Sequence, residues 1–235
     1  MENRIEKVYY DNTKRPVLLI LPGGGYFMTS DREAYPIANE FLSTGFHQAI
    51  FYYREDKKKY PEILTDAKKH IEELMKDPLI GDIHIMGFSA GGHFAGLLLT
   101  EFPEMFKTGI LCYPVISTDK LIMHEDSFKN LLKNYPDELD KVSIEKNIKT
   151  NTPPMYIWHT MEDPLVPYQN SIVLMEALKE KNIEVKLRLF DKGPHGLALA
   201  NRLTSYDDMN PLEYEKQYKE IQKWIKDAKE WLLNH

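Results

Sequence analysis

Short apolar runs, rich in β-branched and aromatic residues, recur along the chain and are separated by longer stretches of mixed polarity. Their apolar character is continuous rather than alternating, which is typical of strands buried on both faces of a parallel sheet. The pattern predicts strands at residues 17–21, 48–53, 83–86, 109–113, 155–158 and 185–190.

The stretches between these runs have the spacing of amphipathic helices. Ile63, Ala67 and Ile71, for example, recur at every fourth position and form one apolar face. Helices are predicted at residues 33–44, 62–76, 90–101, 168–181 and 212–233. Strands that alternate with helices indicate an α/β fold, in which a mostly parallel, twisted sheet carries helices on both faces.

One region, residues 117–154, breaks this alternation with Asp, Lys and Asn residues and ends on two prolines. We expect a short insertion around residues 117–150, made of short helices over one end of the sheet. Neither an internal repeat nor a Gly/Ser-rich or Pro-rich linker divides the rest of the chain. The sequence therefore predicts a single domain over residues 1–235.

Charge and cysteine content narrow the setting in which the protein works. The 30 basic and 36 acidic residues give a net charge of −6, which argues against binding to nucleic acid. The apolar runs are too short to span a bilayer, so no membrane association is expected. Cys112 is the only cysteine, and the N-terminal residues contain no apolar signal-peptide run. Together these features predict a cytoplasmic protein.

The pattern Gly-x-Ser-x-Gly occurs at residues 87–91, directly after the predicted strand at 83–86. A helix is predicted to follow, and this strand–turn–helix setting is the one in which the pattern exposes a nucleophilic serine. Such a tight turn has no room for side chains two positions to either side of the serine. It also aims the first amides of the helix at the reacting centre. Ser89 is therefore the candidate nucleophile.

A nucleophilic serine needs a general base, and the base needs an acid to orient it. His195 lies in a Gly/Pro-rich loop after the last predicted strand and is the candidate base, with His159 as its rival. Asp163 follows the strand at 155–158 and is the candidate acid; the proline after it favours it over the neighbouring Glu162. All candidates follow predicted strands, at the edge where open α/β sheets bind ligands, in the order serine, acid, histidine.

A glycine-rich stretch, residues 22–26, follows the first predicted strand. Backbone N–H groups in such a loop can approach a substrate closely, and a tetrahedral oxyanion needs donors that are fixed before the reaction. We expect the donors to be the amides of Gly24 and Gly25, together with that of Ala90. A phosphate-binding loop is excluded because no Gly-Lys-Ser/Thr follows the glycines.

Three aromatic residues, Tyr26, Phe27 and Phe88, flank the glycine loop and the candidate nucleophile. Their rings are candidate substrate contacts because aromatic faces stack on sugars, and packing in the core is the alternative. The sequence contains no cluster of His, Cys and Asp residues with metal-ligand spacing. We therefore predict neither a metal nor another cofactor.

Together these motifs resemble those of α/β-hydrolases of the esterase and lipase type, and in particular bacterial acetyl-xylan-esterase-like carbohydrate esterases. The matching stretches are residues 22–26, 53–54, 87–93, 113–116, 152–154, 159–167 and 193–197. The resemblance implies an α/β-hydrolase fold with Ser89 as nucleophile, Asp163 as acid and His195 as base. It also places the oxyanion loop at Gly24 and Gly25.

Pro22 departs from the broader lipase and esterase pattern, because the hormone-sensitive-lipase-like group has His at this position. The change removes a hydrogen bond that stabilises the loop, while the fixed φ of proline stiffens it. The proline form is similar to the carbohydrate-esterase branch, which implies an esterase that removes acetyl or other small acyl groups from sugars or oligosaccharides through an acyl-enzyme intermediate. The expected partner is therefore a small-molecule ester. A small peptidase, a general short-chain carboxylesterase and, more remotely, a non-catalytic binding module remain alternatives.

Overall fold

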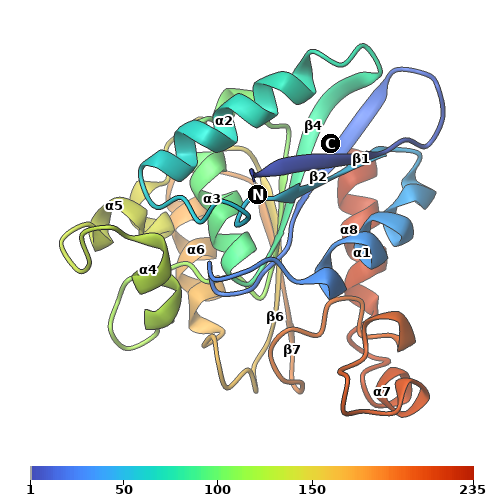
Figure 1. The fold of residues 1–235 in the computed structure, drawn as a ribbon. Coiled ribbons are helices and arrows are strands. Elements are labelled where there is room, and N and C mark those ends of the chain that lie inside the picture. The colour runs from blue at the N-terminus through green and yellow to red at the C-terminus, as the bar shows by residue number, and fades with distance from the viewer. Residues whose placement is uncertain (1) are drawn as a thin grey trace.

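A computed structural model describes residues 2–235, so that Met1, the first residue of the predicted domain, lies outside the described part. Within these residues, seven strands form one sheet in the order β1-β3-β2-β4-β5-β6-β7, drawn between layers of helices in Figure 1. The strands are β1 (Arg4–Val8), β2 (Arg15–Leu21), β3 (His47–Tyr52), β4 (Ile80–Phe88), β5 (Gly109–Cys112), β6 (Met155–Thr160) and β7 (Val185–Phe190). Among the strands of the described residues, only β1 is antiparallel to its neighbour.

The strands predicted from the sequence are all present, and their ends differ from the prediction by a few residues. The strand that the sequence analysis missed is β1, whose Arg-Ile-Glu-Lys-Val sequence contains no apolar run. It pairs with β3 alone and lies at the edge of the sheet, where a strand needs no continuous apolar character. β7, at the opposite edge, is likewise only partly buried.

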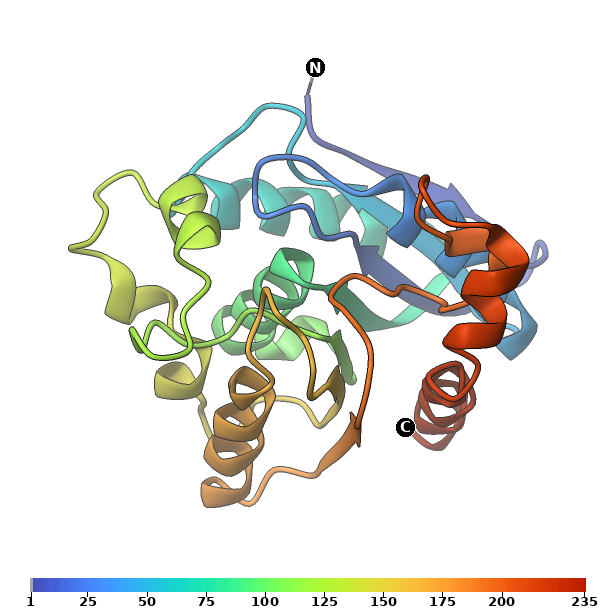
Figure 2. The same ribbon diagram turned by 90° about the horizontal axis from the view of Figure 1, so that it is seen from below.

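Apolar side chains form two clusters, one on each face of the sheet. Helices α2 (Glu62–Met75), α3 (Ala90–Glu101) and α6 (Gln169–Glu180) contribute to one cluster, and α1 (Tyr35–Phe41) and α8 (Lys223–Asn234) to the other. Figure 2, seen along the sheet, shows α1 and α8 together on one side. The predicted arrangement of helices on both faces is therefore confirmed.

Two predicted helices are interrupted. The stretch 33–44 contains α1 between two 3-10 turns, and the stretch 212–233 is divided into α7 (Pro211–Gln217) and α8. No Gly or Pro lies at the second break. The two helices instead have different partners: Tyr214 of α7 donates a hydrogen bond to the Leu197 carbonyl, whereas Trp224 of α8 stacks on Trp158 of the sheet.

The predicted insertion consists of short helices, α4 (Glu125–Leu131), α5 (Leu139–Val142) and a 3-10 turn at Ile144–Asn147. Figure 1 shows α4 and α5 side by side at one flank of the molecule. Phe128 of α4 and Val142 of α5 are fully buried in the cluster on the α3 side of the sheet, and Leu139 packs against it partly buried. None of the helices in residues 2–235 is both long enough and apolar enough to cross a membrane.

Candidate active site

Ser89 lies at the sharp turn between β4 and α3, with φ 54° and ψ −120°. This backbone conformation is strained for a residue other than glycine, and it lifts the partly exposed side chain above the sheet edge. The flanking glycines are needed because backbone segments meet here. A Cβ on Gly87 would lie 2.2 Å from the Gly91 carbonyl oxygen, and one on Gly91 would lie 2.2 Å from the Leu21 carbonyl oxygen.

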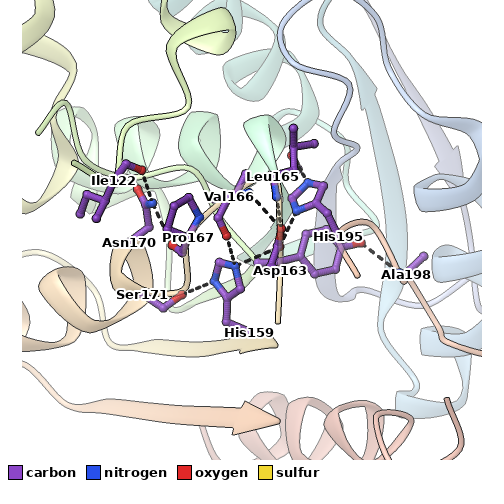
Figure 3. Close-up of polar contacts among 12 residues, drawn as sticks. Ile122, His159, Asp163, Leu165, Val166, Pro167, Asn170, Ser171, His195 and Ala198 are labelled. Atoms are coloured by element: carbon purple, nitrogen blue, oxygen red, sulfur yellow. Dashed lines mark hydrogen bonds and ion pairs between the residues drawn. The ribbon is translucent and has the colours of Figure 1, made fainter. Parts of the chain in front are cut away.

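Ser89, Asp163 and His195 are distant in the sequence but are in direct contact at the end of the sheet; Figure 3 labels Asp163 and His195. His195 Nε2 lies 2.8 Å from Ser89 Oγ, and His195 Nδ1 lies 2.6 Å from Asp163 Oδ2. Because a carboxylate oxygen accepts, Nδ1 carries the proton and leaves Nε2 to accept from the serine hydroxyl. Glu162, the alternative acid, is exposed to solvent and makes no such contact.

The Asp163 side chain is fully buried and its carboxylate is saturated with donors. Oδ1 accepts hydrogen bonds from the amides of Leu165 and Val166, both at 2.9 Å. Burial by itself raises the pKa of Asp163, but the hydrogen bonds from the His159 and His195 rings outweigh it and hold that pKa well below its ordinary value. The carboxylate is therefore charged at neutral pH.

His195 makes two further contacts, one through its ring and one through its backbone. The Tyr113 ring meets it edge to face, with 5.0 Å between ring centroids, and the Tyr206 hydroxyl donates to the His195 carbonyl at 2.6 Å. His159, the rival base, is fully buried and contacts Asp163 rather than Ser89. The geometry thus pairs the serine with His195 and leaves His159 behind the acid.

The glycine loop lies against the candidate nucleophile, since a Cβ on Gly23 would be 2.9 Å from Ser89 Cβ. Gly24 and Gly25 both have positive φ, of 127° and 61°, which favours glycine at these positions. Within residues 2–235, the amides of Gly24, Gly25 and Ala90 donate no hydrogen bond, whereas the Gly23 amide donates to Glu33 Oε2 at 2.7 Å. The three predicted oxyanion donors are therefore available to a ligand.

Glu33 is a residue of the site that the sequence analysis did not identify. Its carboxylate is 4% exposed and accepts from the Gly23 amide and from the Tyr113 hydroxyl, the latter at 2.6 Å. The same hydroxyl accepts from the Ala198 amide at 3.0 Å, so that Glu33 joins the glycine loop to the loop that carries the histidine. In the sequence, nothing distinguishes Glu33 from Asp31, which lies in the same turn and is exposed.

The hydrogen bonds that anchor the glycine loop explain why the loop needs no histidine at the position of Pro22. Its carbonyl oxygen accepts a hydrogen bond from the Tyr53 hydroxyl at 2.8 Å. At the next residue, Glu33 holds the Gly23 amide, and Asn130 of α4 donates to the Gly25 carbonyl at 2.9 Å. The loop is thus anchored at three points without a histidine at position 22.

Two of the three aromatic residues considered as substrate contacts are buried, and for them the prediction is wrong. Tyr26 is 0% exposed and its hydroxyl donates to His93 Nδ1 at 2.6 Å. Phe88 is also 0% exposed and packs against Trp224 of α8. Side chains alternate between the two faces of a strand, and that of Phe88 lies on the face covered by α8. Phe27 is 66% exposed and remains a candidate.

The site therefore combines a serine hydroxyl, an imidazole held by a buried carboxylate, and backbone N–H groups without partners. Such a set can activate the serine as a nucleophile and stabilise an oxyanion formed beside it. Across residues 2–235, no group of three or more His, Cys, Asp and Glu side chains is close enough together to hold a metal ion.

The similarity of this chain to known proteins extends over most of its length. It is 34% identical to endo-1,4-beta-xylanase B of Butyrivibrio fibrisolvens, over 85% of this chain and 35% of that protein. It is 27% identical to an acetylxylan esterase of Xylanibacter ruminicola, over 85% of this chain and 44% of that protein. The chain thus spans less than half the length of these two relatives.

Among solved structures, an acetyl ester-xyloside bifunctional hydrolase from Caldicellulosiruptor lactoaceticus superposes with a TM-score of 0.83 at 30% identity, over 97% of this chain and 86% of that one. The fold is that of the α/β-hydrolases, as the resemblance in the sequence implied. Residues 39–228 match the model of the prolyl oligopeptidase family, Peptidase_S9. This match covers most of the chain, and the protein belongs to the prolyl oligopeptidase family.

Proposed function

We propose that the protein is a serine carboxylic-ester hydrolase that removes acetyl or other small acyl groups from sugars or oligosaccharides. The observation that carries this proposal is the contact chain from Ser89 Oγ through His195 to Asp163, with distances of 2.8 Å and 2.6 Å. Free amides beside the serine support acyl transfer over other reactions, because they are donors for a tetrahedral oxyanion.

In the proposed reaction, Ser89 Oγ attacks the ester carbonyl carbon while His195 Nε2 takes the hydroxyl proton. The carbonyl oxygen becomes an oxyanion that accepts hydrogen bonds from the amides of Gly24, Gly25 and Ala90. When the intermediate collapses, the bond to the leaving oxygen breaks and His195 returns the proton to the departing alcohol. This leaves an acyl group on the serine.

A water molecule completes the cycle. His195 takes a proton from the water, the resulting oxygen nucleophile attacks the acyl carbon, and Ser89 Oγ leaves with the proton that His195 gives back. Throughout, the charge on Asp163 stabilises the protonated imidazole and keeps its Nδ1–H pointing at the carboxylate. The products are the free alcohol and a carboxylic acid, which is acetate for an acetylated sugar.

The acetylated-sugar substrate is supported by the names of two similar proteins, an acetylxylan esterase and an acetyl ester-xyloside hydrolase. We propose to measure acetate release from acetylated xylo-oligosaccharides beside hydrolysis of aryl esters of increasing acyl length. Acetyl esters are expected to react fastest. A preference for long acyl chains would refute the carbohydrate substrate and leave the serine chemistry intact.

A peptidase is the second candidate, because the family whose model matches residues 39–228 is named for prolyl oligopeptidases. The same nucleophile and base can cleave an amide, and the leaving group is then an amine instead of an alcohol. Anilides of acylated amino acids distinguish the two functions when tested beside the matching esters. An esterase is expected to cleave the esters and leave the anilides almost unreacted.

A further inference from the structure

A second histidine lies behind the candidate acid, on the side away from Ser89. His159 is on β6, and its Nε2 is 3.2 Å from Asp163 Oδ2, the same oxygen that meets His195. Figure 3 shows the two imidazoles on opposite sides of this carboxylate. On the basis of the proposed function, we propose that His159 is a positioning residue, which holds the Asp163 carboxylate in the orientation that meets His195.

The hydrogen-bond partners of His159 define its tautomer. Nε2 also lies 3.0 Å from the Val166 carbonyl oxygen, and both neighbours of Nε2 are acceptors, so this nitrogen carries a proton. Nδ1 lies 2.8 Å from the Ser171 hydroxyl of α6. Burial lowers the pKa of His159, so the ring is neutral at neutral pH and its Nδ1 accepts the hydrogen bond from Ser171.

His159 thereby completes the shell of donors around Asp163. Its Oδ1 accepts hydrogen bonds from the amides of Leu165 and Val166, and its Oδ2 accepts hydrogen bonds from the two imidazole N–H groups. With its side chain 0% exposed, this carboxylate has no water to replace a lost donor. If one donor is removed, the negative charge of this buried carboxylate is only partly compensated. The carboxylate can then turn away from His195.

The groups that bind His159 are themselves held by hydrogen bonds, as a positioning role requires. Ser171 follows Asn170, whose amide group donates to the carbonyls of Ile122 and Pro167. Asn170 thereby ties the insertion to the acid loop, residues 161–168 between β6 and α6 (Figure 3). The Val166 carbonyl, the second acceptor of His159, belongs to the same acid loop. His159 therefore links β6, α6 and the acid loop at one buried point.

Removal of the His159 N–H is expected to raise the pKa of Asp163, because a hydrogen bond to the charged form is lost while burial remains. The titratable groups around Asp163 are His159, His195, His124 and Tyr206. Of these, His159 and His195 donate directly to the carboxylate. The acid limb of the pH–rate profile reports protonation of the coupled imidazole–carboxylate pair, in which the carboxylate is then the stronger acceptor, so loss of the first donor should move this limb to higher pH.

The test compares His159→Phe, which fills the volume without a donor, with His159→Gln, which still presents an N–H group. The matched control is His84→Phe. His84 is also a buried histidine on a central strand, but it contacts Thr108 instead of Asp163. For each variant, kcat, KM and the pH profile are measured on a short aryl acetate. The active fraction is titrated with a fluorophosphonate probe, so that misfolded protein is not counted.

We expect His159→Phe to lower kcat roughly tenfold or more at unchanged KM, and to shift the acid limb upwards by roughly half a unit or more. His159→Gln should lose less activity than His159→Phe, and His84→Phe should match the wild type. Wild-type kcat and acid limb in His159→Phe would overturn the inference, as would a larger loss for Gln than for Phe, the order expected from packing alone.

The rate of fluorophosphonate labelling separates this inference from the proposed function. Labelling depends on the nucleophilicity of Ser89 and not on the identity of the natural substrate. If the wild type labels but hydrolyses no acetyl ester, the proposed function fails. The labelling rates of the two His159 variants then still decide whether His159 positions the acid.

Discussion

Replacement of Glu33 by glutamine tests the buried link between the glycine loop and the loop after β7 that carries His195. The Glu33 carboxylate accepts from the Gly23 amide at 2.7 Å and from the Tyr113 hydroxyl at 2.6 Å. A glutamine can accept only one of these donors, because its second polar atom is itself a donor. The Tyr113 hydroxyl already receives the Ala198 amide, so a buried donor is left without an acceptor.

One lost hydrogen bond to a buried carboxylate costs about 2 kcal/mol of unfolding free energy, which in a chain of 235 residues lowers Tm by about 4–8 °C. The Gly24 and Gly25 amides also shift away from the oxyanion position, so kcat on a short aryl ester should fall about tenfold. Asp31→Asn, an exposed change in the same turn, is the matched control. If Glu33→Gln keeps both the wild-type Tm and the wild-type kcat, the Glu33 hydrogen bonds contribute neither to stability nor to the position of the oxyanion donors.

Three further predictions follow from the geometry of the site. Gly91→Ala brings a Cβ to 2.2 Å from the Leu21 carbonyl oxygen, so it should cost about 3 kcal/mol or more in urea unfolding; near-wild-type stability would contradict the close approach. The pKa of Asp163 is lowered in the folded state, so its stabilising contribution is present above about pH 4 and is lost as the pH falls further. The difference in unfolding free energy between wild type and Asp163→Asn should therefore narrow from about pH 7 to about pH 3, and a constant difference would refute the linkage. Because any histidine that acts as a general base must be neutral, kcat/KM should be lower at about pH 5 than at about pH 8, and a flat profile would exclude a histidine base.

The sequence predicted the α/β architecture because buried parallel strands have continuous apolar runs. The nucleophile turn was also predictable, since a Cβ at Gly87 or Gly91 would lie only 2.2 Å from a backbone carbonyl oxygen, which leaves room for glycine alone. β1 was missed because an edge strand needs no such run. The division between α7 and α8 was missed because it is determined by tertiary partners and not by a Gly or Pro in the local sequence.

Contacts of the site that depend on long-range packing were not predictable. The sequence offered Tyr26 and Phe88 as substrate contacts, and only the folded chain shows that both rings are buried. Glu33 has the local sequence of an ordinary turn residue, and its role depends on Tyr113, 80 positions later. His159 was considered only as a rival base, since its contact with Asp163 requires the turn of the acid loop.

Direct capture of the acyl-enzyme tests the central claim, namely acyl transfer to Ser89. The protein is mixed with an aryl acetate, quenched in acid within the first turnovers and digested for mass spectrometry. We predict one acetyl group on the peptide that contains Ser89, a burst of aryl alcohol equal to the enzyme concentration, and neither signal in Ser89→Ala. Steady ester hydrolysis by Ser89→Ala at the wild-type rate, with no acetylated peptide in the wild type, would contradict the account.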